Sequence, residues 1–268
     1  MTDKGHYHHR QQHDGPLTTL YLVRHGETEV NRRNCVQGMR VDPPLNERGR
    51  KQAACVGQRF RDVAVDWVVT SNAQRAKETG AAISKEHPSA PVTHMGALNE
   101  LDFGVYEGTH VTAGYNDLVH AWDVEHRAEL QAPGTLGESP AMCERRAMQG
   151  LREVVAQAVS SERKHVCVVV HSRLIQIVLA SMLDGTLSTM ALYKQKKAAV
   201  NVIDIVGSAP TAEWPYRCVA HEINSESHMS SEVISRVSSA TSLATRSTSD
   251  ERIRFEVDAD GALVLRRL

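Results

Sequence analysis

Short apolar runs alternate with helix-like segments along most of this 268-residue chain. Runs rich in valine and bounded by polar residues predict β-strands, and they lie at 18–24, 65–70, 165–170, 198–206 and 217–223. Segments with helical periodicity separate them, at 46–61, 72–86, 139–160 and 173–183. Three of these helices start at a residue that makes a good N-cap, namely Asn46, Asn72 and Ser139.

The alternation of strands and helices predicts an α/β fold, a three-layer α/β/α sandwich with a mostly parallel central sheet. Strands that are almost entirely apolar need cover on both faces, which helices provide. In such sheets ligands bind at the carboxyl ends of the strands. Arg24–His25, Ser71 and His171 each follow a predicted strand, so we expect these side chains to meet at one edge of the sheet.

Composition and periodicity divide the chain into four predicted parts. They are a flexible N-terminal tail over 1–16, one domain over 17–229, a Ser/Thr-rich linker over 230–250 and a C-terminal hairpin over 251–268. The hairpin is predicted from two alternating runs around Asp260-Gly261. Within the domain, the segment 102–137 has weak periodicity and mixed polarity, and we expect it to form a lid-like insertion.

Charge and cysteine content narrow the class of protein. A net charge of −1 gives no general attraction to nucleic acid or to anionic membranes, and no apolar run approaches the ~18 residues of a membrane span. The N-terminal stretch is polar and lacks the apolar core that is typical of a secretion signal. Five cysteines without a CxxC pair argue against a disulfide framework or a structural zinc site. We therefore predict a cytoplasmic protein that binds neither nucleic acid nor membrane, and we leave a homodimer open.

The first predicted strand runs straight into Arg24-His25-Gly26-Glu27-Thr28. A buried strand that presents a fixed cation beside an imidazole is costly unless an anion binds there. Later segments add similar chemistry, TSNAQRAKET with Arg75, LNELDFGVYEG with Glu100 and VCVVVHSRLIQIVL with His171. In this order the segments resemble the signature of the histidine phosphatase superfamily, over about residues 20–229. The resemblance implies a phosphoglycerate-mutase-like fold.

The resemblance also implies catalytic roles. His25 would attack phosphorus and form a phosphohistidine, and His171 would donate to the phosphoryl oxygens. Arg24 and Arg75 would hold those oxygens with paired donors, and their charges should depress the pKa of His25. Glu100 would protonate the leaving oxygen and then deprotonate water.

Four further residues are expected to bind the substrate, and no metal or other cofactor is expected. Asn31 would contact the phosphate, Gln37 would lie at the rim, and Gly38 would allow close backbone approach. Ser172 stands where the family commonly has glycine, which would narrow the pocket or add a hydroxyl donor. No HExxH, HxH or carboxylate-rich cluster lies near these motifs.

Each of these residues also has a structural interpretation when taken alone. Arg24 would pair with Glu27, and Arg75 would be a solvated helix residue paired with Glu78. His171 would be a core histidine with its hydrogen bonds satisfied. Glu107 and Asp102 compete with Glu100 for the role of the acid.

Three functions remain open. The first is a phosphomonoester hydrolase that acts on a small phosphorylated metabolite, such as a sugar phosphate, or on a phosphopeptide. The alternatives are a cofactor-dependent phosphoglycerate mutase and a regulatory member that binds phosphate without turnover. QGMRVDPPLN, GVYEG and LGESPAMCERR resemble the phosphatase members, and no lysine lies between Lys85 and Lys164 to hold a second anion. These features favour the hydrolase.

Overall fold

The computed structural model describes residues 16–207, 216–229, 253–257 and 263–267. Almost all of the predicted tail at 1–16, and the whole predicted linker at 230–250, lie outside the described residues. The boundaries of the predicted parts stay predictions.

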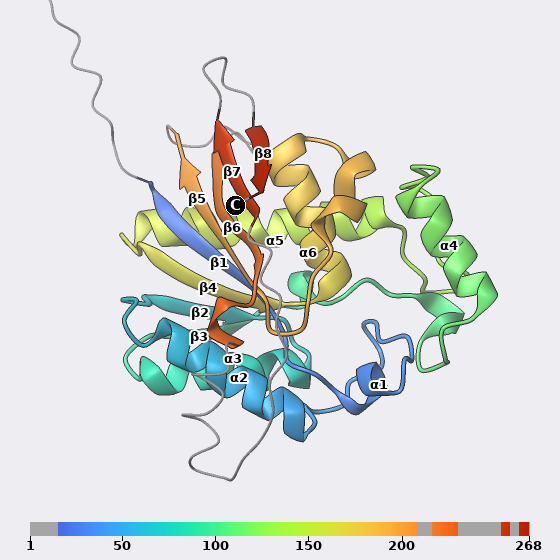
Figure 1. Cartoon of the computed structure of the whole chain (residues 1–268), viewed down its shortest axis with the longest axis horizontal. Helices are drawn as coiled ribbons and strands as arrows, with labels where there is room; N and C mark the ends of the chain where they lie inside the picture. Colours follow the sequence, from blue (N-terminus) through green and yellow to red (C-terminus); the bar gives the residue numbers. More distant parts are fainter. Residues whose placement is uncertain (1–15, 208–215, 230–252, 258–262, 268) are drawn as a thin grey trace, which may run out of the picture.

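A six-stranded sheet forms the centre of the molecule, in the order β3-β2-β4-β1-β5-β6 (Figure 1). Its strands are β1 (Thr18–Arg24), β2 (Trp67–Thr70), β3 (Val92–His94), β4 (His165–Val170), β5 (Val200–Val206) and β6 (Arg217–Ser225). The first four pair in parallel, whereas β5 is antiparallel to both β1 and β6. The prediction of an α/β fold with a mostly parallel sheet is confirmed.

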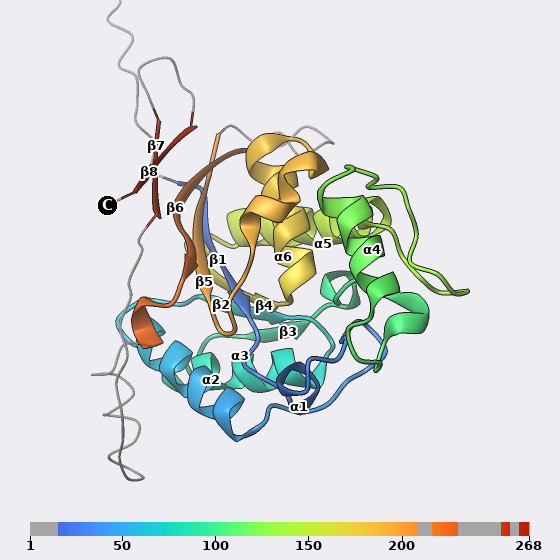
Figure 2. The ribbon, with the colours of Figure 1, turned by 45° about the vertical axis from the view of Figure 1, so that its right-hand side comes forward.

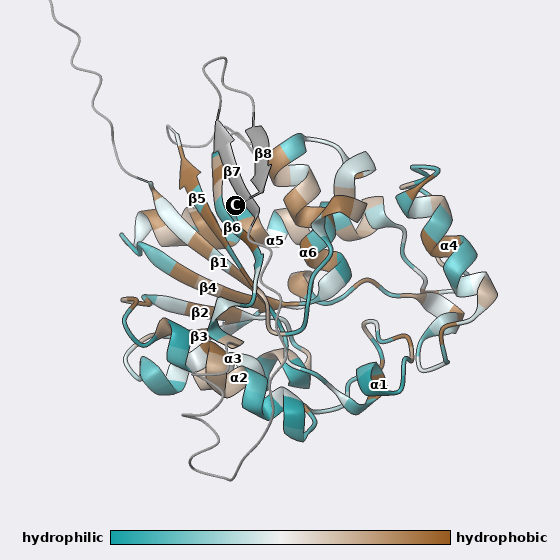
Figure 3. Ribbon diagram, viewed as in Figure 1, coloured by the Kyte–Doolittle hydropathy of each residue, from teal (hydrophilic) through white to brown (hydrophobic). Residues whose placement is uncertain are grey.

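Helices cover both faces of this sheet (Figure 2). On one face lie α2 (Glu47–Phe60) and α3 (Gln74–Glu86), and on the other lie α5 (Pro140–Ser160) and α6 (Ser172–Leu179). Alternate residues of β1 enter the two cores, since Leu20 and Leu22 pack on the α5–α6 side and Tyr21 and Val23 on the α2–α3 side. Apolar residues accordingly follow the strands and α6, whereas α2 exposes a hydrophilic surface (Figure 3).

Two of the three predicted N-caps, Asn46 and Ser139, are confirmed. The side chain of Asn46 accepts from the N–H of Gly49 at 2.8 Å, and Ser139 accepts from Met142 at 3.2 Å. Asn72 does not cap its helix, because α3 begins two residues later, at Gln74. There the carboxylate of Asp42, from a distant loop, accepts the Gln74 N–H at 2.8 Å.

The segment 102–137 contains a short 3-10 turn at Gly104–Tyr106 and helix α4 (Ala113–Asp123). Its aromatic residues contribute to the larger of the two cores, since Trp122 is fully buried and packs near Phe103.

At the other end of the chain, β7 (Ile253–Val257) and β8 (Leu263–Arg267) pair antiparallel in a separate two-stranded sheet, with β7 beside β6 (Figure 2). Across the described ranges, none of the helices combines the length and apolar character that crossing a membrane requires.

Candidate active site

His25 directly follows β1, and its side chain is buried. Its backbone N–H donates to the carbonyl of Val170, at the end of β4, over 3.0 Å. The ring Nδ1 lies 2.7 Å from the carbonyl oxygen of Gly26. Because a carbonyl only accepts, Nδ1 carries the ring proton and Nε2 keeps its lone pair. Arg75 directs its Nε–H at this Nε2 over 3.3 Å, so the lone pair of His25 faces a guanidinium.

Arg75 lies in the first turn of α3 and is fully buried. Its guanidinium donates to the carbonyls of Val41 at 3.1 Å and Gly38 at 3.0 Å, and it lies 3.4 Å from a carboxylate oxygen of Asp42. The interpretation of Arg75 as a solvated partner of Glu78 is wrong, because Arg75 points inward and Glu78 bonds other groups. Its position in the first turn directs it toward the carboxyl ends of the strands.

Arg24 ends β1 beside His25, and its Nη1 donates to the carbonyl of Gln195 at 2.6 Å. Its Nε is buried and has no hydrogen-bond partner among the described residues. The alternative in which Arg24 pairs with Glu27 is wrong, since Glu27 forms its ion pairs with Arg48 at 3.5 Å and Lys197 at 3.9 Å. Arg24 therefore presents an unsatisfied donor to the site.

His171 follows β4 and lies beside His25, with the two ring centroids 5.2 Å apart. Its Nε2 lies 2.7 Å from the hydroxyl of Ser71, which follows β2. Its Nδ1 is buried and has no partner within the described part of the chain. A core histidine with all its hydrogen bonds satisfied is therefore ruled out. Residues from the ends of β1, β2 and β4 meet here, as the strand-end pattern predicts.

Burial lowers the pKa of both His25 and His171 well below the usual value for histidine, and the charge of Arg75 lowers each pKa further. Both imidazoles are therefore neutral at neutral pH. A neutral imidazole with its proton on Nδ1 has the lone pair that a nucleophile needs. Burial also lowers the pKa of Arg24 and Arg75.

Glu100 is buried, and its carboxylate lies at the N-terminus of α6. One oxygen accepts from the backbone N–H of Leu174 at 2.9 Å and of Leu101 at 3.0 Å, and the other accepts from Arg173 N–H at 3.1 Å. Free N–H groups and the helix dipole both favour a negative charge at such a position. The side chain of Glu100 is thus held in one place by α6.

The two carboxylates that compete with Glu100 have other roles in the structure. Asp102 pairs with Arg40 at 3.0 Å. Glu107 accepts only from the backbone in the contacts it makes, namely the N–H groups of Met39, Arg40, Val41 and Phe103. It thereby shapes the loop whose carbonyls hold Arg75. Neither carboxylate lines the pocket described next.

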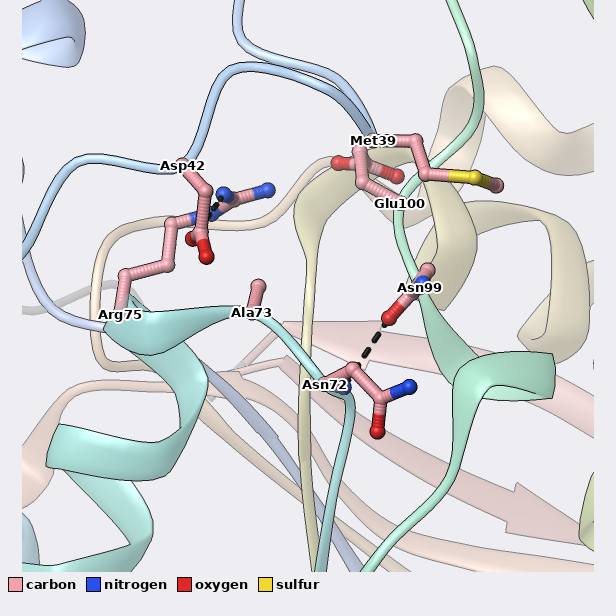
Figure 4. Close-up of a pocket in the computed structure, with 7 residues that line it drawn as sticks. All are labelled: Met39, Asp42, Asn72, Ala73, Arg75, Asn99 and Glu100. Carbon is pink, nitrogen blue, oxygen red and sulfur yellow. Dashed lines mark hydrogen bonds and ion pairs between the residues drawn. The ribbon is translucent and has the colours of Figure 1, made fainter.

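A small pocket of about 90 Å³ opens beside this cluster, and Figure 4 shows its lining. It is lined by Met39, Asp42, Asn72, Ala73, Arg75, Asn99 and Glu100. Arg75 and Asp42 lie on one side, and Asn72 and Asn99 lie on the other, joined by a hydrogen bond of 3.0 Å from the backbone N–H of Asn72. Of the cluster, Arg75 and Glu100 line this pocket, whereas Arg24, His25 and His171 are not among its lining residues. A molecule bound in the pocket would therefore meet Arg75, two carboxylates and two amides.

Asn31 and Gln37 are not among the residues that line the pocket. The Asn31 side chain contacts the backbone N–H of Thr28 at 3.4 Å and the Gln37 amide at 3.0 Å. The amide of Gln37 also lies 3.1 Å from Nη1 of Arg75. In the structure both residues contact groups of the protein around Arg75.

Gly38 and Ser172 are also absent from the residues that line the described pocket. A Cβ at Gly38 would collide with the carboxylate of Glu107 and would lie 2.7 Å from the carbonyl oxygen of Leu101. Glycine is therefore required by the protein's own packing at this position. Ser172 is the first residue of α6 and is partly buried.

Several contacts that position the site use groups to which the sequence assigns no role. The Gly26 N–H donates to the hydroxyl of Thr79 at 3.1 Å, and the Ala198 N–H donates to the carbonyl of His25 at 3.2 Å. Ala198 has a φ of +59°, which costs an alanine about 1 kcal/mol or more. Its carbonyl accepts from His228 over 3.0 Å. These contacts use mainly the backbone, which any residue supplies.

Acid should destabilise the protein through its buried neutral histidines. Burial and Arg59 lower the pKa of His228 to about 4, so the unfolded chain binds a proton from about pH 6.5 downward while the folded chain does not. Stability is therefore present above pH 6.5 and is lost as the pH falls toward 4. His228 should contribute about 2 kcal/mol to the loss between pH 7 and pH 5, and His25 and His171 should act in the same direction.

Denaturant unfolding at pH 7 and pH 5 measures this loss, with His228→Gln as the test variant. Glutamine keeps an N–H for the carbonyl of Ala198 but does not titrate, so the loss should shrink by about 2 kcal/mol. His110→Gln, at an exposed position, should leave the loss unchanged. An equal loss in wild type and His228→Gln would contradict the prediction.

The chain is similar in sequence to known proteins. A family model described as the histidine phosphatase superfamily (branch 1) matches residues 20–216. The uncharacterized phosphatase PhoE of Bacillus subtilis is 41% identical over 92 residues, which are 34% of this chain and 47% of PhoE. The probable phosphoglycerate mutase GpmB of Citrobacter koseri is 39% identical over 95 residues, which are 35% of this chain and 43% of GpmB. The matches span about half the length of these curated relatives.

Solved structures share the fold over a larger part of the chain. YhfR of Bacillus stearothermophilus superposes with a TM-score of 0.66 at 25% sequence identity. The superposition covers 80% of this chain and 100% of YhfR.

Proposed function

The chain belongs to the histidine phosphatase superfamily, and from this premise we propose that it hydrolyses phosphomonoesters through a phosphohistidine formed on His25. One observation carries the proposal. His25 has its proton fixed on Nδ1 by the Gly26 carbonyl, at 2.7 Å, so that Nε2 keeps a lone pair. Around it lie Arg75 and two buried nitrogens without partners in the described chain, Nε of Arg24 and Nδ1 of His171. A phosphoryl group would accept from Nε of Arg24, and from Nδ1 of His171 in the tautomer that carries its proton there.

In the first step, Nε2 of His25 forms a bond to phosphorus as the bond from phosphorus to the leaving oxygen breaks. The leaving oxygen takes a proton from Glu100, which acts in the fraction of the enzyme whose Glu100 carboxyl carries a proton. Arg24 and Arg75 stabilise the charge on the phosphoryl oxygens. His171 donates to the same oxygens when its hydrogen bond to Ser71 places the ring proton on Nδ1.

In the second step, water attacks phosphorus and the N–P bond breaks. Glu100, now a carboxylate, accepts the proton of the attacking water, and the electron pair of the N–P bond returns to Nε2. Orthophosphate leaves, and the enzyme is restored to its first state. These steps need no metal or other cofactor.

The pocket favours a leaving group without a second negative charge. Arg75 is the one cation among the residues that line it, and it is already engaged beside His25. The carboxylate of Asp42 would repel a second anion in the pocket. Asn72 and Asn99 offer hydrogen bonds to hydroxyl groups. We therefore propose a small monophosphate of a neutral alcohol, such as a sugar phosphate, as the substrate class.

Phosphate release from a panel of monophosphates, run beside a mutase assay, tests the proposal. Sugar phosphates, glycerol phosphate and a phosphoserine peptide would be compared with 3-phosphoglycerate in the presence of bisphosphoglycerate. The best neutral-alcohol ester should exceed 3-phosphoglycerate in kcat/KM by about tenfold or more, since each tenfold corresponds to about 1.4 kcal/mol.

Two outcomes would contradict the proposal. Isomerisation of 3-phosphoglycerate with little phosphate release would assign the chain to the mutases, as the name of the relative GpmB allows. Binding of inorganic phosphate without any turnover would assign a regulatory role. The cytoplasmic location stays a prediction.

A further inference from the structure

Arg146, on α5, bonds the main chain on both sides of Glu100. Its Nη1 donates to the carbonyls of Asn99 at 2.8 Å and Ala97 at 2.9 Å, and its Nη2 donates to the carbonyl of Glu100 itself at 2.9 Å. The side chain is largely buried, with 21% of its surface exposed. A planar guanidinium whose donors meet three carbonyls within residues 97–100 allows this stretch of backbone little freedom.

Glu138 fixes the orientation of Arg146. Its two oxygens accept from Nε and Nη2 of Arg146, both at 2.7 Å, in a bidentate pair. The same carboxylate accepts from the N–H of Asp102 at 3.1 Å, and the Glu138 N–H donates to the carbonyl of Asp102 at 2.9 Å. The loop from 97 to 102 is thereby held to the start of α5.

The side chain of Glu100 is set by a different element. Its carboxylate accepts from Leu174 at 2.9 Å and Arg173 at 3.1 Å, at the N-terminus of α6. Arg146 fixes the backbone of Glu100, and α6 fixes its carboxylate. A displacement of the loop by about 1 Å would withdraw the carboxylate from the leaving oxygen, and misplacement of that size can cost about 10²-fold in rate.

We propose that Arg146 is a positioning residue for the acid–base steps and acts through Glu100; this inference rests on the proposed phosphatase function. Arg146 does not line the pocket, so it is not placed to touch the substrate. Its charge also lowers the pKa of His171, and a variant that keeps the charge therefore isolates its effect on the placement of Glu100. Replacing Arg146 should therefore lower kcat/KM most for substrates whose leaving group must be protonated by Glu100. An alkyl phosphate has a poor leaving group and needs a proton from Glu100, whereas p-nitrophenyl phosphate has a good leaving group and does not.

The test compares kcat/KM for glycerol phosphate and for p-nitrophenyl phosphate in wild type, Arg146→Lys and Glu100→Gln. Lysine keeps the charge but loses the paired donors. Arg146→Lys should lower the glycerol phosphate value about 10²-fold and the p-nitrophenyl phosphate value less than about tenfold. A double variant that combines Arg146→Lys with Glu100→Gln should have the same kcat/KM for glycerol phosphate as Glu100→Gln alone, because Arg146 acts through Glu100.

Arg145→Lys is the matched control, since Arg145 is the preceding residue on α5 and its side chain is 64% exposed. It should leave both values unchanged. Glu138→Gln, which keeps the shape of the side chain but weakens the bidentate pair, should show the pattern of Arg146→Lys in milder form. This second variant decides the matter if Arg146→Lys fails to fold.

The outcomes separate the inference from the proposed function. If wild type is active, and Arg146→Lys and Glu138→Gln lower kcat/KM by the same factor for both esters, then Arg146 has a merely structural role and the inference is overturned. Additive effects of Arg146→Lys and Glu100→Gln would overturn it as well. A wild type that releases phosphate from neither ester would overturn the proposed function, and the inference with it.

Discussion

Replacing His25 by alanine should lower phosphate release by about 10⁴-fold or more, because the variant lacks the nucleophile that forms the covalent intermediate. Nothing nearby replaces it. His171 is the other imidazole in the cluster, with its ring centroid 5.2 Å away, but its Nε2 is engaged with Ser71 at 2.7 Å. Steady-state phosphate release on the best substrate of the panel measures the loss.

The loss should affect chemistry far more than binding. Arg24 and Arg75 remain in His25→Ala, so inorganic phosphate should still raise the melting temperature of the variant. Rapid quenching of wild type with labelled substrate should trap a phosphoenzyme that is stable in alkali and labile in acid, and the variant should trap none. His110→Ala, at an exposed position, serves as the control. A His25→Ala enzyme with more than about a tenth of wild-type turnover would rule out His25 as the nucleophile.

The sequence predicts the architecture well where a local pattern decides the structure. The bounds of β1 and β4 agree with the apolar runs at 18–24 and 165–170, because these strands are buried on both faces and must be apolar throughout. β3 escapes prediction because it is a short edge strand whose Val92 is 46% exposed. The start of α3 is misplaced because its cap, Asp42, comes from a distant loop.

The sequence predicts which strand-end residues meet at the site, but it does not predict which groups their side chains bond. The convergence of His25, His171 and Ser71 follows from the carboxyl ends of a parallel sheet. The pairing of Arg75 with Glu78 is a local rule for a helix surface, and it fails because α3 turns this position into the protein. The bond from Arg24 to the Gln195 carbonyl cannot be predicted from the sequence, because every residue has a backbone carbonyl.

Unsatisfied buried donors are expensive for a folded protein. Natural interiors bond almost all of their buried polar groups, whereas this cluster keeps Nε of Arg24 and Nδ1 of His171 without partners in the described chain. Burial lowers the pKa of Arg24, the charge of Glu100 partly offsets this, and the charge of Arg75 lowers the pKa further. Such a site exchanges stability for the ability to bind an anion, so Arg24 should contribute little to folding but be essential for function.

Arg24→Met should therefore change the free energy of unfolding in phosphate-free buffer by less than about 1–2 kcal/mol, because removal of a buried charge offsets the loss of the hydrogen bond to the Gln195 carbonyl. The same variant should lose about 10³-fold or more in phosphate release, because charge stabilisation supplies most of phosphoryl transfer. It should also lose the stabilisation by inorganic phosphate, which in wild type reaches about 2.7 kcal/mol at a concentration of 100 Kd. Denaturant unfolding with and without phosphate measures both stability effects.

Arg32→Met, which removes an exposed arginine paired with Glu29, should change each quantity by less than about 1 kcal/mol. An Arg24→Met protein that is markedly less stable than wild type without phosphate would show that Arg24 supports the fold itself, and the exchange of stability for anion binding would be wrong for this residue.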